Sequence, residues 1–186
     1  IAFRDCSSMS PDIDECVSNL SVATWNWTNL YKKKKISLEI SKFKKANNSI
    51  YPVEAKSTGS YQNACLSKYQ ALKNGFDDSL FVDIDNFISE SSACNIFWVK
   101  DDNIFTPKPN SILKGVTRKV VIDILKKNKI KISEDFFTID QLNFADEVFL
   151  TGTAAEIINV SRINNINYKQ EEKTDFLKSE FEKLKK

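Results

Sequence analysis

The hydrophobic positions along the chain fall into short runs that are separated by polar turns. Residues 36–43 (ISLEISKF) alternate between apolar and polar side chains, a pattern that predicts a strand with one buried face. β-Branched and aromatic residues are concentrated in further short runs, which predict strands as well. These runs cover residues 21–27, 79–84, 95–99, 129–133, 147–151 and 156–163.

Three other segments carry apolar residues at helical spacing. The first covers residues 60–74 and ends at Gly75, a residue typical of helix C-termini. A short amphipathic helix is expected at the C-terminus, and strands and helices interleave, which is the pattern of the α/β class. The remaining predicted helix begins at Gly115, and its apolar face is expected to consist of Val116, Val120, Val121, Ile124 and Leu125.

Length and charge restrict the possible classes of protein. A chain of 186 residues predicts one domain, or one domain with an extension. We expect a main domain over residues 1–168 and a helical extension over residues 169–186. Lys and Arg number 27 against 25 Asp and Glu, and four of the lysines (residues 32–35) are interpreted as a solvated turn, so no nucleic-acid partner is expected. The sequence contains no run of about 18 apolar residues, so no membrane-spanning segment is expected.

Histidine is absent, which excludes Ser-His-Asp and Cys-His catalysis and histidine-ligated metal sites. No metal site is expected. The cysteines show no CxxC spacing, and at this chain length that favours reduced thiols and a cytoplasmic location. The cysteines are Cys6, Cys16, Cys65 and Cys94.

Two charged residues stand out from the apolar pattern. Lys56 lies between an extended segment and a predicted helix, where a rigidly held amine can be desolvated and can act as a nucleophile. Tyr61 follows five residues later. Glu90 stands among small residues between two apolar strands. A carboxylate there either caps a turn or is buried against a cationic partner, and the local sequence favours capping.

Two hydroxyl-rich segments are candidates for anion binding. LKGVTR (113–118) places free N–H groups at a helix start, and LTGTAAE (150–156) places Thr and Gly at a strand end. Each segment is also compatible with a plain turn. A lysine, a carboxylate, a tyrosine and two such segments together predict a pyridoxal-phosphate site. The lysine would bind the cofactor covalently, and the carboxylate would keep the pyridine nitrogen protonated.

These motifs resemble those of the class IV (fold type IV) pyridoxal-phosphate aminotransferases over about residues 1–165. The signature of the family begins with a glutamate and continues through an asparagine, a threonine and a glycine to a final basic residue. The segment FADEVFLTGTAAEI (144–157) is most similar to the branched-chain amino-acid aminotransferases. The matching positions of the signature and of an upstream A-K-x-x-G-x-Y motif are Glu90, Asn95, Phe97, Thr106, Gly115 and Arg118, and Ala55, Lys56, Gly59 and Tyr61.

The resemblance implies a role for each candidate site residue. Lys56 would form the Schiff base with the cofactor and transfer protons, and Glu90 would pair with the pyridine nitrogen. Tyr61 would hydrogen-bond the phenolic oxygen of the cofactor and border the substrate. The phosphate would be bound by Val116, Thr117 and Thr153, and the substrate by Trp27, Tyr61, Thr153 and Ala154.

The resemblance also implies a fold and an activity. The chain is expected to be the large C-terminal domain of this fold, the type of D-amino-acid aminotransferase, without the small N-terminal domain. The expected reaction is transamination of branched-chain L-amino acids with 2-oxoglutarate in a homodimer or higher homo-oligomer, and the 186 residues alone are expected to be inactive. The alternatives are a D-amino-acid transaminase, an aminodeoxychorismate lyase or a non-catalytic remnant. One departure is Phe43-Lys44-Lys45, where the family has an arginine-rich stretch.

Overall fold

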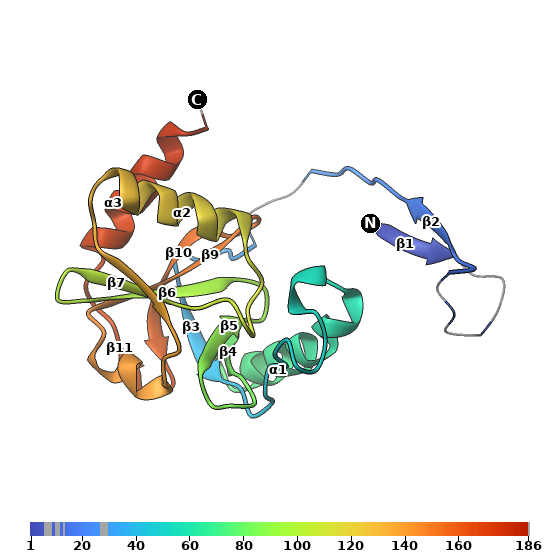
Figure 1. Cartoon of the computed structure of the whole chain (residues 1–186). Helices are drawn as coiled ribbons and strands as arrows, with labels where there is room; N and C mark the ends of the chain where they lie inside the picture. The colour runs from blue at the N-terminus through green and yellow to red at the C-terminus, as the bar shows by residue number, and fades with distance from the viewer. Residues whose placement is uncertain (6–8, 10–11, 13, 27–29, 186) are drawn as a thin grey trace.

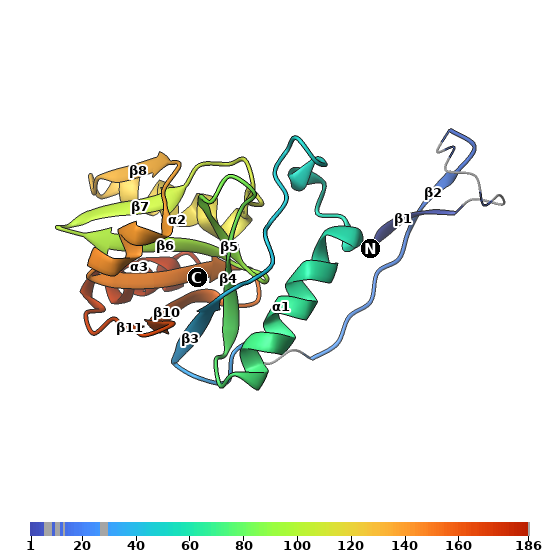
Figure 2. The same cartoon turned by 90° about the horizontal axis from the view of Figure 1, so that it is seen from below.

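The computed structural model describes residues 1–5, 9, 12, 14–26 and 30–185. These residues form a two-stranded sheet and a nine-stranded sheet. The small sheet is an antiparallel hairpin of β1 (Ala2–Asp5) and β2 (Val17–Leu20). The hairpin projects away from the remaining elements in both views (Figure 1 and Figure 2).

Most strands of the large sheet close into a ring. β9 pairs with both β6 and β10, which closes the order β10-β3-β4-β5-β6. β3 runs parallel to β10 and β4, and the other neighbours in the ring are antiparallel. The ring strands are β3 (Lys35–Ile40), β4 (Asp78–Val82), β5 (Ile88–Ser91), β6 (Asn95–Lys100), β9 (Glu147–Gly152) and β10 (Glu156–Ile163).

The sheet forks at the beginning of β6. One edge of β6 is occupied by β9 over its length. The other edge pairs with β5 at Asn95 and with β7 from Trp98 to Lys100. The strands outside the ring are β7 (Asn103–Pro107), β8 (Ile132–Asp135) and β11 (Ile166–Asn167).

The helices cover different sides of the ring (Figure 1 and Figure 2). α2 and α3 contact each other and lie against β9, whereas α1 packs on β4. The carboxylate of Glu147 in β9 accepts hydrogen bonds from the backbone N–H of Lys173 and from the N–H and hydroxyl of Thr174, which fastens α3 to the sheet. The helical segments are α1 (Gln62–Lys73), α2 (Val116–Lys127), α3 (Glu172–Lys183) and the 3-10 turns η1 (Val53–Ala55), η2 (Thr58–Tyr61) and η3 (Ile139–Phe144).

Two apolar cores result from the alternation of side chains along the strands. Along β6, Ile96 and Trp98 belong to one buried cluster, and Phe97 and Val99 belong to the other. The second cluster includes residues of α2 and α3 and therefore lies between the sheet and these helices. Because successive residues of a strand point to opposite faces, β6 separates the two cores.

Several predicted elements differ from the structure. Residues 21–26 form no strand, and the hairpin strand β2 lies before them. The strands β5 and β7 were not predicted. The sequence of β5 is ISES, whose polar residues are all buried, so hydrophobic alternation gives no signal there. Gly75 does follow α1 with a φ of 82°, as predicted. Val116 is exposed, which contradicts its place on the buried face of α2.

The thiols differ partly from expectation. Cys65 and Cys94 are free, but Cys16 is disulfide-bonded. Disulfides persist mainly in oxidising compartments, so the cysteines no longer support the expected cytoplasmic location. Among the described residues, no helix has the length and the apolar composition to cross a membrane.

Candidate active site

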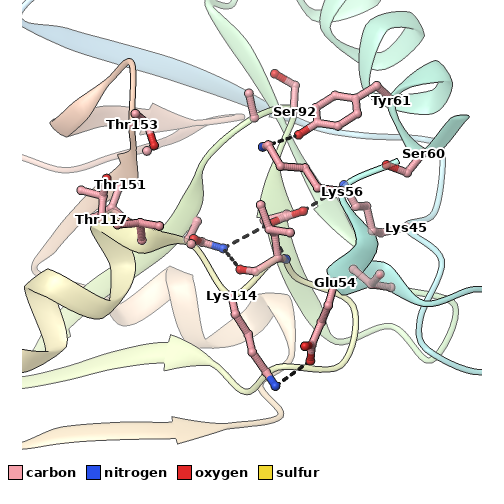
Figure 3. Close-up of a pocket in the computed structure, with 18 of the residues that line it drawn as sticks. Lys45, Glu54, Lys56, Ser60, Tyr61, Ser92, Lys114, Thr117, Thr151 and Thr153 are labelled. Atoms are coloured by element: carbon pink, nitrogen blue, oxygen red, sulfur yellow. Dashed lines mark hydrogen bonds and ion pairs between the residues drawn. The ribbon is translucent and has the colours of Figure 1, made fainter. Parts of the chain in front are cut away.

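A cavity of about 260 Å³ lies where β5, β6, β9, the beginning of α2 and the η1–η2 segment meet (Figure 3). Each element supplies polar groups to the cavity. Of the predicted site residues, those that line it are Lys56, Tyr61, Glu90, Val116, Thr117 and Thr153. The tertiary structure therefore brings together residues that are far apart in the sequence.

Two predicted substrate residues are not placed in this cavity. Trp27 lies outside the described residues. Ala154 follows the lining residue Thr153, and its carbonyl oxygen accepts a hydrogen bond from the backbone N–H of Leu30 at 3.4 Å. This contact connects the turn after β9 to the segment that precedes β3.

Lys56 lies between η1 and η2 in a left-handed backbone conformation, with a φ of 50°. For a residue with a side chain this conformation is uncommon, and surrounding contacts must maintain it. The Lys56 Nζ atom donates a hydrogen bond to the Tyr61 hydroxyl at 2.9 Å (Figure 3). The side chain is exposed, so the desolvation that we expected for this amine is absent from the described structure.

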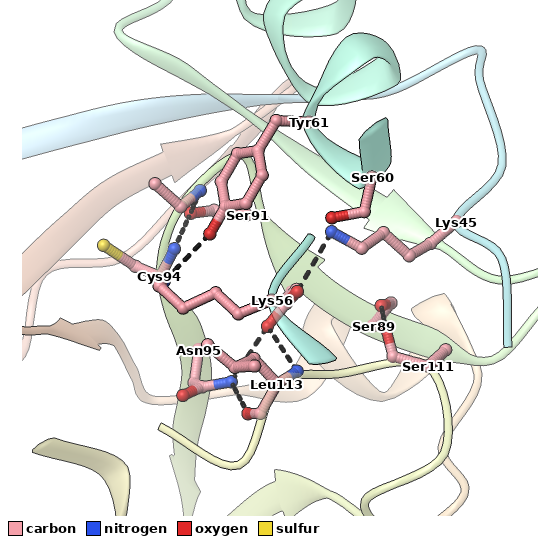
Figure 4. Close-up of polar contacts among 12 residues, drawn as sticks. Lys45, Lys56, Ser60, Tyr61, Ser89, Ser91, Cys94, Asn95, Ser111 and Leu113 are labelled. Atoms are coloured by element: carbon pink, nitrogen blue, oxygen red, sulfur yellow. Dashed lines mark hydrogen bonds and ion pairs between the residues drawn. The ribbon is translucent and has the colours of Figure 1, made fainter. Parts of the chain in front are cut away.

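Glu90 lies on β5 and is buried. Its Oε1 atom is 3.0 Å from the Lys45 Nζ atom, and its Oε2 atom accepts hydrogen bonds at 3.0 Å from both Asn95 Nδ2 and the Leu113 N–H (Figure 4). The turn-capping interpretation was therefore wrong, and the carboxylate is buried against a cation. Burial raises the pKa of Glu90, while Lys45, the Leu113 N–H and Lys56 oppose this rise.

Lys45 is a site residue that the sequence did not reveal. It is buried beside Glu90, and its Nζ atom also lies 5.5 Å from the centre of the Phe81 ring. In the sequence it ends the stretch Phe43-Lys44-Lys45, and nothing in that pattern separates a buried lysine from its solvated neighbours. The available signal was its position in the sequence. The family that the chain resembles has an arginine-rich stretch there, and arginine and lysine are both cations.

The anion-binding groups lie at the opposite side of the cavity. Gly115 precedes α2. The first N–H groups of a helix have no intrahelical partner, and no described side chain caps them in α2. Thr151 lines the cavity, and its hydroxyl is fully buried and has no hydrogen-bond partner among the described residues. A buried hydroxyl without a partner is costly, so it lowers the stability of the described fold.

These groups fit pyridoxal phosphate. An anionic phosphate matches the free N–H groups of α2 and the hydroxyls of Thr117 and Thr153. A protonated pyridine nitrogen matches the buried carboxylate of Glu90, and an aldehyde matches the amine of Lys56. All of these groups face one cavity, which is the arrangement that such an elongated and bifunctional cofactor requires.

Sequence comparison relates this chain to known enzymes. A family model described as amino-transferase class IV matches residues 8–163. A probable branched-chain-amino-acid aminotransferase of Rickettsia typhi is 35% identical over 150 residues, covering 78% of this chain and 52% of that protein. One from Aquifex aeolicus is 33% identical over 168 residues, covering 89% and 54%. The chain therefore spans about half the length of the curated relatives it matches.

Structural comparison leads to the same family. The branched-chain aminotransferase of Thermoproteus uzoniensis, solved with norvaline, has a TM-score of 0.93 at 27% identity, covering 97% of this chain and 61% of that one. The T.th. branched-chain amino acid aminotransferase with pyridoxamine 5'-phosphate has a TM-score of 0.78 at 32% identity, covering 84% and 54%. The fold is thus the α/β fold expected for the large domain of fold type IV, and the chain belongs to the class IV aminotransferase family.

Proposed function

We propose that the protein containing this chain is a pyridoxal-phosphate-dependent aminotransferase that acts on branched-chain L-amino acids and 2-oxoglutarate. The observation that carries the proposal is the single cavity that contains Lys56, the buried carboxylate of Glu90 and the uncapped start of α2. When bound, pyridoxal phosphate supplies an electron sink for negative charge at the α-carbon of the substrate.

Lys56 would hold the cofactor covalently through its Nζ atom and would hold or move a proton beside the α-carbon of the substrate. Its long, flexible side chain is suited to both tasks. The Tyr61 hydroxyl, 2.9 Å from Nζ, orients the amine while it is free. The short η1 and η2 turns hold both residues at the same side of the cavity.

Glu90 holds the ring nitrogen of the cofactor in its protonated form. A carboxylate can do this only while it is ionised, and burial opposes ionisation. The positive charge of Lys45 and the N–H of Leu113 counteract burial from two directions. The Glu90 carboxylate is thus already oriented and would hold a protonated ring nitrogen in place.

The phosphate is bound mainly by neutral donors. The N–H groups of Val116 and Thr117 lie in the first turn of α2, where the helix dipole favours an anion. The Thr153 hydroxyl lies on the turn that follows β9, at the same side of the cavity (Figure 3). These donors would hold the phosphate between the start of α2 and the end of β9.

The substrate class is inferred from relatives. Two of them are named branched-chain-amino-acid aminotransferases at 33–35% identity. The solved T.th. enzyme has also been crystallised with 4-methylvaleric acid, an apolar branched acid. We infer that the complete protein is a homodimer or a higher homo-oligomer and that residues outside this chain complete the substrate pocket. The 186-residue chain alone should then have no transaminase activity.

The test is an assay of the full-length protein that contains these residues. Supplied with pyridoxal phosphate, it should transfer the amino group of leucine, isoleucine or valine to 2-oxoglutarate, and D-alanine should be a poor substrate. Glu90→Gln should retain the cofactor and lower turnover roughly a hundredfold, equivalent to about 3 kcal/mol. Glu182→Gln, on the surface of α3, is the matched control. A preference for D-alanine would refute the proposed substrate class. Unchanged turnover of Glu90→Gln would refute the proposed role of Glu90.

A further inference from the structure

Asn95 is a buried residue of the cavity. It begins β6 at the fork of the sheet, and the residue is only 5% exposed. Its Nδ2 atom donates two hydrogen bonds, one to Glu90 Oε2 at 3.0 Å and one to the carbonyl oxygen of Leu113 at 2.8 Å (Figure 4). Both N–H bonds of the amide are therefore used.

The oxygen atom of the Asn95 amide restricts which residue can occupy position 115. A Cβ atom added to Gly115 would overlap Asn95 Oδ1, far inside contact distance. Gly115 has a φ of −62°, a conformation open to any residue. The position requires glycine because of the Asn95 side chain and not because of the backbone.

Asn95 therefore touches both ends of the cavity. Glu90 lies at one end, and the segment from Leu113 to Gly115 leads into α2 at the other. The Leu113 N–H also donates a hydrogen bond to Glu90 Oε2 at 3.0 Å. Glu90 is therefore connected to the Leu113 backbone both directly and through the Asn95 amide.

We propose that Asn95 is a positioning residue that fixes the distance between the Glu90 carboxylate and the phosphate-binding start of α2. The proposal rests on the proposed function, since it assumes one ligand that spans both ends. A ligand that binds at two ends gains affinity only when their separation matches its own length. Asn95 sets that separation by holding a carboxylate, a carbonyl oxygen and a glycine with one rigid amide.

The amide is chemically suited to this task. Two of its neighbours, a carboxylate and a carbonyl oxygen, are hydrogen-bond acceptors, and an NH₂ group can donate to both. An ionised aspartate would repel Glu90, and leucine would leave both acceptors without this donor.

The first experiment compares ligands that occupy one end or both ends. Binding of pyridoxal phosphate, pyridoxal without phosphate, and inorganic phosphate is measured for the full-length wild-type protein and for Asn95→Ala. We expect pyridoxal phosphate to bind roughly tenfold more weakly to the variant, and each single-end ligand to change by less than about twofold. Asn159→Ala, which removes a buried amide of β10 outside the cavity, is the matched control and should leave all three affinities unchanged.

The outcomes separate a positioning role from a local one. An equal loss for inorganic phosphate or for pyridoxal would show that Asn95 serves one end only or that the fold is damaged, and it would overturn the proposal. Unchanged binding of pyridoxal phosphate would overturn it as well. A wild-type protein that binds no pyridoxal phosphate would instead contradict the proposed function.

The second experiment tests the steric part without any cofactor. Gly115→Ala should destabilise the cofactor-free protein, because its Cβ meets Asn95 Oδ1. In the double variant Asn95→Ala/Gly115→Ala the space is free, so Gly115→Ala should cost less there than in the wild-type background. Equal shifts of the unfolding midpoint in the two backgrounds would show that Asn95 does not impose the glycine.

Discussion

Besides its phosphate-binding side at the start of α2, the cofactor cavity has a carboxylate end and a lysine end, and these two are built in different ways. The carboxylate end, consisting of Glu90, Lys45 and Asn95, is buried, and strand pairing and the fork of the sheet hold it in place. The lysine end, consisting of Lys56 and Tyr61, is carried by short 3-10 turns, and its Lys56 side chain is exposed. One end is ordered by the core of the protein and the other by local contacts.

This difference corresponds to the work of each end. The Glu90 carboxylate must keep one position and one charge, which a buried network with several partners provides. The Lys56 amine must alternate between bound and free states, which a long side chain on a surface segment permits. Substitutions at the carboxylate end should therefore affect stability as well as function, whereas those at the lysine end should leave stability nearly unchanged.

The largest expected effect is at the lysine end. Lys56→Ala should abolish the covalent link to pyridoxal phosphate completely, as measured by borohydride reduction followed by intact mass. The free energy of unfolding should change by less than about 0.5 kcal/mol, because the side chain is exposed. Lys126→Ala on the surface of α2 is the control and should keep the adduct. A trapped adduct in Lys56→Ala would show that another lysine reacts.

The next effect is at the carboxylate end. Lys45→Met should leave the buried Glu90 charge without its cation and lower the free energy of unfolding at neutral pH by about 3 kcal/mol. Lys45→Arg retains the charge and should lose much less. In the Glu90→Gln background, Lys45→Met should cost less than about 1 kcal/mol. Equal costs in the two backgrounds would show that the ion pair is not the cause.

The same variant predicts a pH dependence. Burial raises the pKa of Glu90, so the folded protein holds this proton at pH values where the unfolded chain has released it. Stability from this group is therefore present at low pH and is lost as pH rises through the raised pKa. Lys45→Met raises that pKa further, so the loss should be larger and should extend to higher pH. Denaturation midpoints from about pH 4 to about pH 8 measure it.

A smaller effect tests the anion side of the cavity. Thr151→Val removes a buried hydroxyl without a described partner, so it should stabilise the cofactor-free protein by up to about 1 kcal/mol. Thr106→Val is the matched control, because its buried hydroxyl donates to the Ile96 carbonyl oxygen at 2.8 Å. The control should destabilise by about 1 kcal/mol. If the free energy of unfolding shifted in the same direction in both variants, the Thr151 hydroxyl would not be the unpaired one.

The smallest effect concerns the surface contact beside Lys56. Glu54 pairs with Lys114 at 2.6 Å, and both side chains are about half exposed. Glu54→Gln should lower the free energy of unfolding by at most about 0.5 kcal/mol, and salt should screen the difference. Denaturation at low and high ionic strength measures it. A larger, salt-independent loss would show that the pair holds the Lys56 segment more firmly than its exposure indicates.

The sequence by itself determined the family, the α/β class and six of the residues that line the cavity. β3, α1, β6 and β10 were predictable because hydrophobic periodicity is a local property. Lys56, Glu90 and Thr153 were predictable because they lie in short motifs with characteristic spacing. Their chemical roles remain predictions.

Only the tertiary structure decided which polar groups are buried and what they contact. The strand β5, with its buried Ser and Glu, carries no hydrophobic alternation, and Lys45 follows directly after another lysine. Strand pairing between distant segments buries these groups and supplies their partners, so no local pattern marks them. The Glu90–Lys45 pair and the contact between Asn95 and Gly115 exist because the ring of strands closes and the sheet forks at β6.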